Sequence, residues 1–226
     1  MATVKDIKAI KGAYYIRRLI EEGEHEHQDF KFQISDARKI ARSISAFANH
    51  DGGRLLIGVK DNGVVAGVRS DEDLYMIDAA AGMYCTPAVE VEMTAFRCEG
   101  GAVVYRVEIP RVDRRPVCVR EEGDRLKAYY RVADENIAAH PLMVEAWRRQ
   151  AGAAGGLLTF SAAERALLHL LELEEYIEPG EFELRAHLSR RTAAEAIVRL
   201  AALGVVGFIY RGGRFVVGRE PGDDAD

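Results

Sequence analysis

The stretch at residues 46–68, AFANHDGGRLLIGVKDNGVVAGV, constrains the fold most, because turns and apolar runs alternate within it at short intervals. A helix of small and aliphatic residues is predicted to end at Asn49, and two glycines then turn the chain into an apolar strand at residues 55–59. Asn62-Gly63 marks a second turn, since Asn-Gly favours the positive φ angles of tight hairpins. A short strand is expected at residues 64–68, so the stretch predicts a helix followed by a β-hairpin.

Length and composition predict a folded protein with room for one large or two smaller domains, since 48% of the 226 residues are hydrophobic. No apolar run approaches the ~20 residues of a membrane helix, and the N-terminus has no apolar signal core. The three cysteines lie far apart and fit reduced thiols, so a cytoplasmic location without a membrane segment is expected. The net charge of −5 argues against a protein that coats nucleic acid, although local patches can still be basic.

The order of elements in the first domain, residues 1–150, predicts an α+β fold with a mixed or antiparallel sheet. Ser35 or Asp36 caps the helix that ends in the opening stretch, and Ile40, Ile44 and Phe47 form its buried stripe. The expected helices are residues 5–22, 36–49, 71–81 and 142–150, and the expected strands are 24–32, 89–96, 102–109, 116–120 and 125–132.

A run of small residues at 151–156 predicts a linker to a second domain at residues 157–219, followed by an acidic tail at 220–226. Ser161 with Glu164 and Thr192 with Glu195 each have capping-box spacing, which indicates two helix starts. A short helix at residues 181–188 lies between these two helices, and strands at 205–210 and 215–218 flank a glycine-containing turn. Three helices followed by a β-hairpin are typical of a winged helix.

Several residues of the first domain form a motif that identifies a family. They are Glu24, Asp29, Phe30 and Lys31, then residues 46–49, Gly52-Gly53, residues 57–59, Asp61, Gly63, Gly67, Pro116 and Tyr130-Arg131. On these residues the chain resembles the Schlafen AlbA_2 family, formerly grouped as divergent AAA proteins, over roughly residues 15–140. The family usually has glutamate where this chain has Asp29, so one carboxylate is shorter by a methylene.

The resemblance implies a chemistry for Glu24, Asp29 and Asp61. In animal Schlafen proteins the matching acids are implicated in metal-dependent RNA cleavage, and Mg²⁺ or Mn²⁺ takes oxygen ligands of this kind. The resemblance therefore assigns these three acids to a catalytic metal site. The alternative is that Glu24 and Asp29 are solvated charges at a strand end and that Asp61 only begins an Asp-Asn-Gly turn.

Lys31 lies two residues after Asp29, so both side chains project from one face of the predicted strand. It is a candidate to bind a nucleic-acid phosphate or, equally, to neutralise Asp29. ATP is a further candidate ligand, because glycine backbone at Gly52-Gly53 can bind phosphate and some family members carry ATP-binding assignments. The chain has no GxxxxGK[ST] motif, and a strand rather than a helix follows these glycines, which weakens the ATP interpretation.

Basic charge collects in the second half of the predicted winged helix. Residues 161–183 contain seven acids and one arginine, whereas residues 184–219 contain seven arginines and one acid. The third helix and the wing, where a winged helix meets DNA phosphates, are therefore basic. The candidate nucleic-acid contacts are Arg190, Arg191, Arg199, Arg211 and Arg214.

Residues 189–192 and 195–200 are similar to the recognition helix of GntR-type regulators, with a shorter preceding turn. Ala194 stands where those regulators often have a basic residue, so recognition of base edges is expected to be weak. Residues 111–131 add seven basic against four acidic residues, which is typical of a solvated face or of an extended nucleic-acid track.

These features favour a DNA-binding, transcription-regulating protein that acts as a homodimer. One alternative is a metal-dependent endoribonuclease that uses the three acids. Another is a non-catalytic protein that serves as an assembly or dimerisation module or binds a nucleotide.

Overall fold

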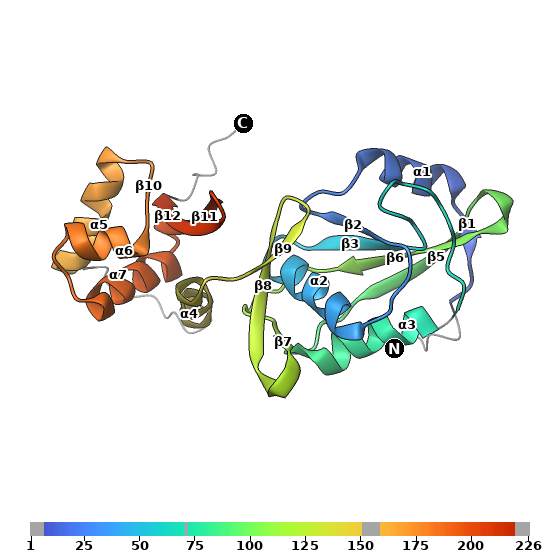
Figure 1. Cartoon of the computed structure of the whole chain (residues 1–226), viewed down its shortest axis with the longest axis horizontal. Coiled ribbons are helices and arrows are strands. Elements are labelled where there is room, and N and C mark those ends of the chain that lie inside the picture. Colours follow the sequence, from blue (N-terminus) through green and yellow to red (C-terminus); the bar gives the residue numbers. More distant parts are fainter. Residues whose placement is uncertain (1–6, 71, 151–158, 220–226) are drawn as a thin grey trace. The chain divides into compact units, whose positions relative to one another are not determined.

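The computed structural model describes residues 7–70, 72–150 and 159–219 and divides the chain into two compact units, 1–139 and 140–226 (Figure 1). Helix α4 (Pro141–Gln150), expected at the end of the first domain, contributes Ala146 to the core of the second unit. The boundary between the units therefore precedes this helix. The predicted linker and tail lie outside the described residues. Within those residues, no helix has the length and apolar character needed to cross a membrane.

A mixed five-stranded sheet lies at the centre of the first unit, with the strand order β1-β5-β6-β3-β2. The outer pairs β1–β5 and β2–β3 are parallel, whereas the inner pairs are antiparallel. The α+β prediction with a mixed sheet is therefore confirmed. The strands are β1 (Ile10–Lys11), β2 (Gln28–Lys31), β3 (Gly53–Ile57), β5 (Glu92–Arg97) and β6 (Val103–Ile109).

Both faces of this sheet are buried, as strand β3 shows. Leu55 and Ile57 face the larger core, to which helix α2 (Ala37–Asn49) contributes, and Leu56 faces a smaller core that includes helix α1 (Ala13–Glu22). Successive strand side chains point to opposite faces, so one apolar strand supplies both cores.

Helix α2 also packs against a second sheet, which has four strands in the order β4-β7-β8-β9. Asp36 is its N-cap, and its carboxylate accepts a hydrogen bond from the Arg38 amide. The predicted stripe of Ile40, Ile44 and Phe47 is fully buried, and the helix ends at Asn49 as expected. The strands are β4 (Cys85–Thr86), β7 (Cys118–Arg120), β8 (Leu126–Val132) and β9 (Glu135–Ala138), and helix α3 (Glu72–Ala79) continues as a π-helix over Ala80–Tyr84.

The predicted second strand of the hairpin, residues 64–68, does not form. The chain makes only an isolated bridge between Val59 and Val65. The Val68 amide instead donates to the Val103 carbonyl at 2.8 Å. The end of this segment is therefore tied to β6 and does not continue a ladder with the preceding strand.

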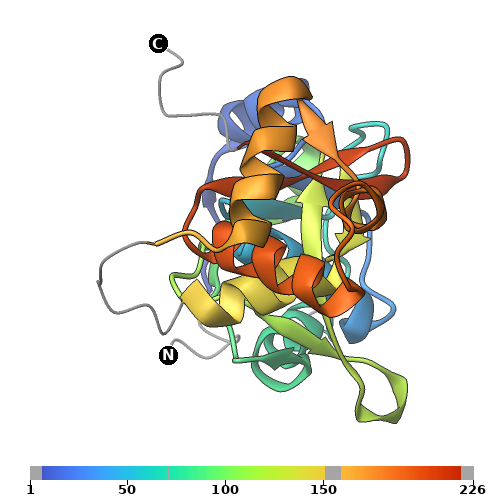
Figure 2. The same cartoon turned by 90° about the vertical axis from the view of Figure 1, so that its left-hand side faces the viewer.

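The second unit contains three helices and a hairpin in the predicted order, but α4 precedes them and the unpredicted strand β10 lies between the first two of these helices; Figure 2 shows the unit from its side of the molecule. The capping box of Ser161 and Glu164 forms as expected. The expected box of Thr192 and Glu195 does not, because the last helix starts earlier and is capped by Ser189, whose side chain accepts from the Thr192 amide. The elements are α5 (Ala162–Leu173), β10 (Tyr176–Ile177), α6 (Pro179–Arg185), α7 (Arg190–Ala202), β11 (Val206–Arg211) and β12 (Arg214–Arg219), and the sheet order is β10-β12-β11.

Candidate functional site

Glu24 and Asp29 form a carboxyl pair at the edge strand β2. Asp29 is only 4% exposed, and Glu24 accepts a hydrogen bond from the Phe30 amide at 2.8 Å. Burial, followed by the hydrogen bond with Asp29, raises the pKa of Glu24 from 4.5 to about 7, although the Phe30 amide opposes the rise. The Glu24 carboxyl therefore holds a proton close to neutral pH, as expected of two adjacent acids.

Two cations lie beside Asp29. Lys31 Nζ is 2.7 Å from Asp29 Oδ2, and Arg131 Nη1 lies 3.9 Å from the same oxygen. The prediction that Lys31 and Asp29 share one strand face is confirmed. Because Lys31 already pairs with Asp29, the structure favours the neutralising role of Lys31 over a phosphate contact.

Arg131 is a residue whose role the sequence did not reveal beyond its place in the motif. It is 1% exposed, its guanidinium donates to the carbonyls of His25 and Gln28 at 3.2 Å, and it lies over the Phe47 ring at 4.8 Å. The sequence contained one signal for this burial: Arg131 follows Tyr129 by two residues, so both side chains lie on the same buried face of the strand. These hydrogen bonds connect β8 to the backbone of His25 and Gln28, next to Glu24 and Asp29.

Asp61 does not join the carboxyl pair. It lies exposed in a tight turn that is closed by a hydrogen bond from the Gly63 amide to the Lys60 carbonyl. Across the described ranges, no three His, Cys, Asp or Glu residues are grouped so that they could hold a metal ion. The expected arrangement of Glu24, Asp29 and Asp61 as one metal site is therefore not formed, because Asp29 is buried and paired while Asp61 faces solvent.

The glycine turn is not an open phosphate cradle. The Gly52 amide donates to the Phe47 carbonyl at 2.9 Å, and an added Cβ at Gly52 would lie 2.9 Å from the Ile109 carbonyl oxygen. At Gly53 an added Cβ would overlap the Phe47 ring. These glycines serve close packing, so the geometry does not favour the predicted ATP site here.

In the second unit, Arg190 and Arg191 occupy the first turn of α7 and are both exposed. Neither forms a hydrogen bond or salt bridge with another residue of the described chain. The amino end of a helix carries partial positive charge, which adds to that of the two guanidinium groups. The first turn of α7 is therefore a positively charged surface suited to phosphate.

The acid nearest to this turn is neutralised within the unit. Arg149 of α4 makes two hydrogen bonds to the Glu195 carboxylate, at 2.6 and 3.0 Å. These bonds lower the pKa of Glu195, so its charge is retained and balanced by Arg149. Arg149 thus provides the main partner of Glu195, and Arg191 adds a weaker coulombic interaction with the same carboxylate.

Arg199 has a structural position that the sequence did not indicate. Its guanidinium donates to both oxygens of Glu164, at 3.0 and 3.2 Å, and to the Thr159 carbonyl. Glu164 is 2% exposed, and its carboxylate also completes the cap of α5. These contacts favour a structural role for Arg199 over the predicted phosphate contact.

The two arginines that flank the turn between β11 and β12 are exposed but paired. Arg211 lies 3.2 Å from Glu175 and over the Tyr176 ring, and Arg214 lies 2.9 Å from Glu178. Exposed pairs of this kind contribute about 0–1 kcal/mol, so a phosphate group can replace the carboxylate at little cost.

Comparison with known proteins identifies the first unit. The family model described as Schlafen, AlbA_2 matches residues 24–140, which is just over half of the chain. No curated protein matches the chain.

Two of the solved structures that are similar to the chain illustrate the match. The DIP2311 protein from Corynebacterium diphtheriae has 20% identity and a TM-score of 0.42, covering 84% of this chain and 34% of its own. The N-terminal domain of a Nitrosomonas europaea protein named for its relation to the ATP-dependent DNA helicase RecG has 17% identity and a TM-score of 0.40. That match covers 68% of this chain and 97% of the domain. The chain thus spans about a third of the Corynebacterium protein.

Proposed function

The chain belongs to the Schlafen AlbA_2 family, and we propose that it binds duplex DNA through its second unit, acting as a winged helix. The order of α5, α6 and α7 followed by the β11–β12 hairpin supports this assignment. In winged-helix and other helix-turn-helix proteins the recognition helix enters the major groove while flanking elements contact the backbone. Here α7 would be that helix.

One observation carries the proposal: Arg190 and Arg191 are exposed and unpaired within the described chain, at the amino end of α7. Most other arginines of this unit have a carboxylate partner, as Arg199, Arg211 and Arg214 do. Phosphate binding releases counterions from DNA, so two unpaired arginines add affinity without breaking an internal ion pair. Arg211 and Arg214 are secondary contacts, because each must leave its carboxylate partner, Glu175 or Glu178, before it can bind a phosphate.

The face of α7 predicts how specific the binding is. Ala193, which is buried, and Ala194, which is partly buried, each have only a methyl group as a side chain. Neither can therefore form a hydrogen bond with a base edge. Backbone contacts fix position but carry no sequence information directly. We therefore propose phosphate-dominated binding, and a transcription-regulating homodimer as its biological form, since such regulators bind paired half-sites as dimers.

The double substitution Arg190→Ala with Arg191→Ala tests the proposal. Binding of the full chain to a labelled duplex is measured by fluorescence anisotropy over a series of salt concentrations. Loss of two phosphate contacts should reduce the slope of log K against log salt by about 2 and weaken binding to all duplex sequences similarly. Thermal unfolding of the variant checks that the unit still folds.

Arg17→Ala with Arg18→Ala is the matched control, because it removes the same charge from exposed positions on α1 in the first unit. The control should keep the salt slope of the unsubstituted protein. If the Arg190→Ala, Arg191→Ala variant binds duplex as tightly as the control variant and the unsubstituted protein do, α7 is not the DNA contact. If only single-stranded RNA binds and Arg190 and Arg191 are required, the unit binds nucleic acid but the duplex-DNA assignment is wrong.

A further inference from the structure

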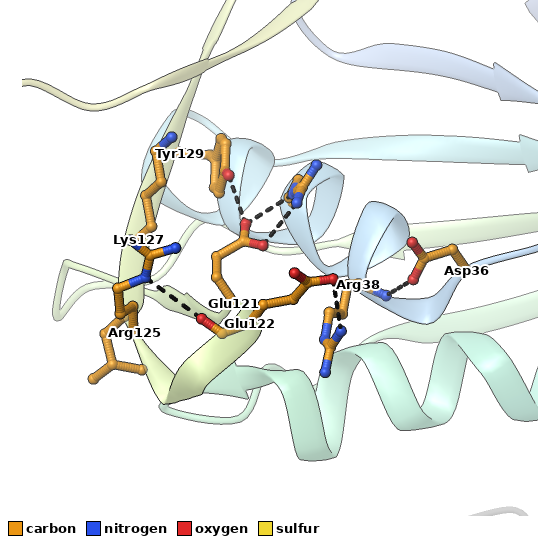
Figure 3. Close-up of a pocket in the computed structure, with 9 residues that line it drawn as sticks. Asp36, Arg38, Glu121, Glu122, Arg125, Lys127 and Tyr129 are labelled. Atoms are coloured by element: carbon orange, nitrogen blue, oxygen red, sulfur yellow. Dashed lines mark hydrogen bonds and ion pairs between the residues drawn. The ribbon is translucent and has the colours of Figure 1, made fainter.

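A polar pocket of about 630 Å³ lies in the first unit between the start of α2 and the turn that joins β7 to β8 (Figure 3). Its volume is in the range of small-molecule sites. Four cationic side chains line it: Arg38 and Arg42 from α2, and Arg125 and Lys127 from the hairpin. These two pairs are more than eighty residues apart in the sequence, and the fold brings them to one opening.

Two of the acids that line the pocket are committed to other groups. Glu121 accepts two hydrogen bonds from Arg42, at 2.8 and 2.7 Å, and a third from the Tyr129 hydroxyl at 2.6 Å. The Arg42 bonds lower the pKa of Glu121, so this carboxylate stays ionised and bound. Asp36 is the N-cap of α2 and accepts from the Arg38 amide. Glu121 is therefore bound mainly by Arg42, with Lys127 contributing a weaker coulombic interaction, and Asp36 keeps one oxygen on the amide of Arg38.

Arg38 has unused hydrogen-bonding capacity. Its Nε is buried and has no hydrogen-bond partner in the described chain. Its guanidinium lies 5.4 Å from the centroid of the Tyr84 ring, which fixes its plane. The nearest acid is Glu122 at 3.9 Å, and that side chain is 87% exposed. An ion pair of this length to an exposed carboxylate leaves the terminal nitrogens of Arg38 open to a better acceptor, whereas the buried Nε is not accessible to a ligand.

Lys127 and Arg125 face the same opening, as Figure 3 shows. Lys127 Nζ lies 5.3 Å from the centroid of the Tyr129 ring and forms no salt bridge with another described residue. Arg125 donates from Nε only to the Glu122 carbonyl, at 3.4 Å. Arg38 thus lines one side of the pocket and Arg125 and Lys127 the other, with Glu121 and Glu122 between them.

We propose that this pocket binds a chain of phosphate groups, whose oxygens accept hydrogen bonds from Arg38 on one side of the pocket and from Arg125 and Lys127 on the other. Guanidinium groups bind phosphate through paired N–H donors, and a lysine adds a point charge. The exposed Leu126 at the rim offers apolar contact to the group that carries the phosphate. The ligand class is a nucleotide unit, either free as a nucleoside polyphosphate or within a single strand. This site is separate from α7 and does not depend on duplex binding by the second unit.

Calorimetric titration of the full chain tests the site with three probes: inorganic tripolyphosphate, ATP and a short thymidine oligonucleotide. Arg38→Gln with Lys127→Gln removes two of the proposed donors and leaves the bonds of Arg42 to Glu121 intact. The variant should bind at least about tenfold more weakly. Arg17→Gln with Arg18→Gln, the matched charge change on α1, should stay within about twofold of the unsubstituted protein.

The probes distinguish the sources of phosphate. If the variant with Arg38→Gln and Lys127→Gln binds tripolyphosphate and ATP more weakly than the unsubstituted protein does, the ligand is a free nucleoside polyphosphate. If only its binding of the oligonucleotide is weaker, the ligand is a nucleic-acid strand. If no probe binds the unsubstituted protein, or if the variant binds as tightly, the proposal is overturned. Should the variant fail to fold, Arg125→Gln with Lys127→Gln on the exposed hairpin provides the same test. Arg190→Ala with Arg191→Ala should leave tripolyphosphate binding unchanged, which separates this result from the duplex proposal.

Discussion

Replacing Glu24 with glutamine should stabilise the protein at neutral and alkaline pH. The glutamine oxygen can still accept from the Phe30 amide, and its amide nitrogen can donate to Asp29 as the protonated Glu24 does. The substitution therefore resembles permanent protonation of this carboxyl group and removes the repulsion between the negative charges of Glu24 and the buried Asp29.

The sign and size of the effect follow from the raised pKa of Glu24. Because folding raises this pKa, the stabilisation it contributes is complete below 4.5, the usual value, and is lost as pH rises through about 7. A rise from 4.5 to about 7 corresponds to at most about 3 kcal/mol. Glu24 is partly exposed, so solvent screening reduces the expected gain for glutamine to about 1 kcal/mol at pH 8.

Urea denaturation followed by circular dichroism, from pH 4 to 8, measures this gain. The difference in free energy of unfolding between Glu24→Gln and the unsubstituted protein should grow between pH 4.5 and 7 and level off above that range. Glu26→Gln, an exposed position two residues away, is the control and should show little growth. A constant difference across the series would refute proton sharing between Glu24 and Asp29.

Two further substitutions test the contacts that hold each unit. Asn49→Leu should cost about 2–4 kcal/mol in urea denaturation, because it leaves the buried Val117 amide without its acceptor and removes a donor from the Val117 and Tyr129 carbonyls, of which the Val117 carbonyl keeps the Ser45 hydroxyl. A loss below about 1 kcal/mol would contradict this reading. Arg199→Ala should lower the melting temperature, since it removes about 1–3 kcal/mol of pairing with buried Glu164. The same variant should leave the salt slope of duplex binding unchanged, and a reduced slope would restore Arg199 as a phosphate contact.

Local patterns in the sequence were enough to predict α2 and the apolar strand β3 that follows it, whereas the helix expected over residues 5–22 begins only at Ala13 and residues 10–11 form β1 instead. The stripe of Ile40, Ile44 and Phe47 specified the buried face of α2, and Asp36 was one of two predicted caps. The capping box at Ser161 formed for the same reason. Caps and helical periodicity depend on residues within one or two turns, so they can be read from the sequence alone.

Pairings between distant residues were decided only by the tertiary structure. Arg199 and Glu164 are thirty-five residues apart, and their ion pair turned a predicted phosphate contact into a structural one. The position of Asp61 was likewise decided by the tertiary structure. It belongs to the same family motif as Glu24 but lies in a separate, exposed turn.

Sequence counting did find the basic excess at residues 111–131, yet it did not show that Arg125 and Lys127 meet Arg38 across one pocket. Charge composition reports which groups are present, whereas their partners depend on which surfaces the core brings together. The sequence by itself therefore determined the family, the α+β class and the local elements. The tertiary structure decided which charges are neutralised internally and which remain available to a ligand, because electrostatic interaction depends on distance and burial in space.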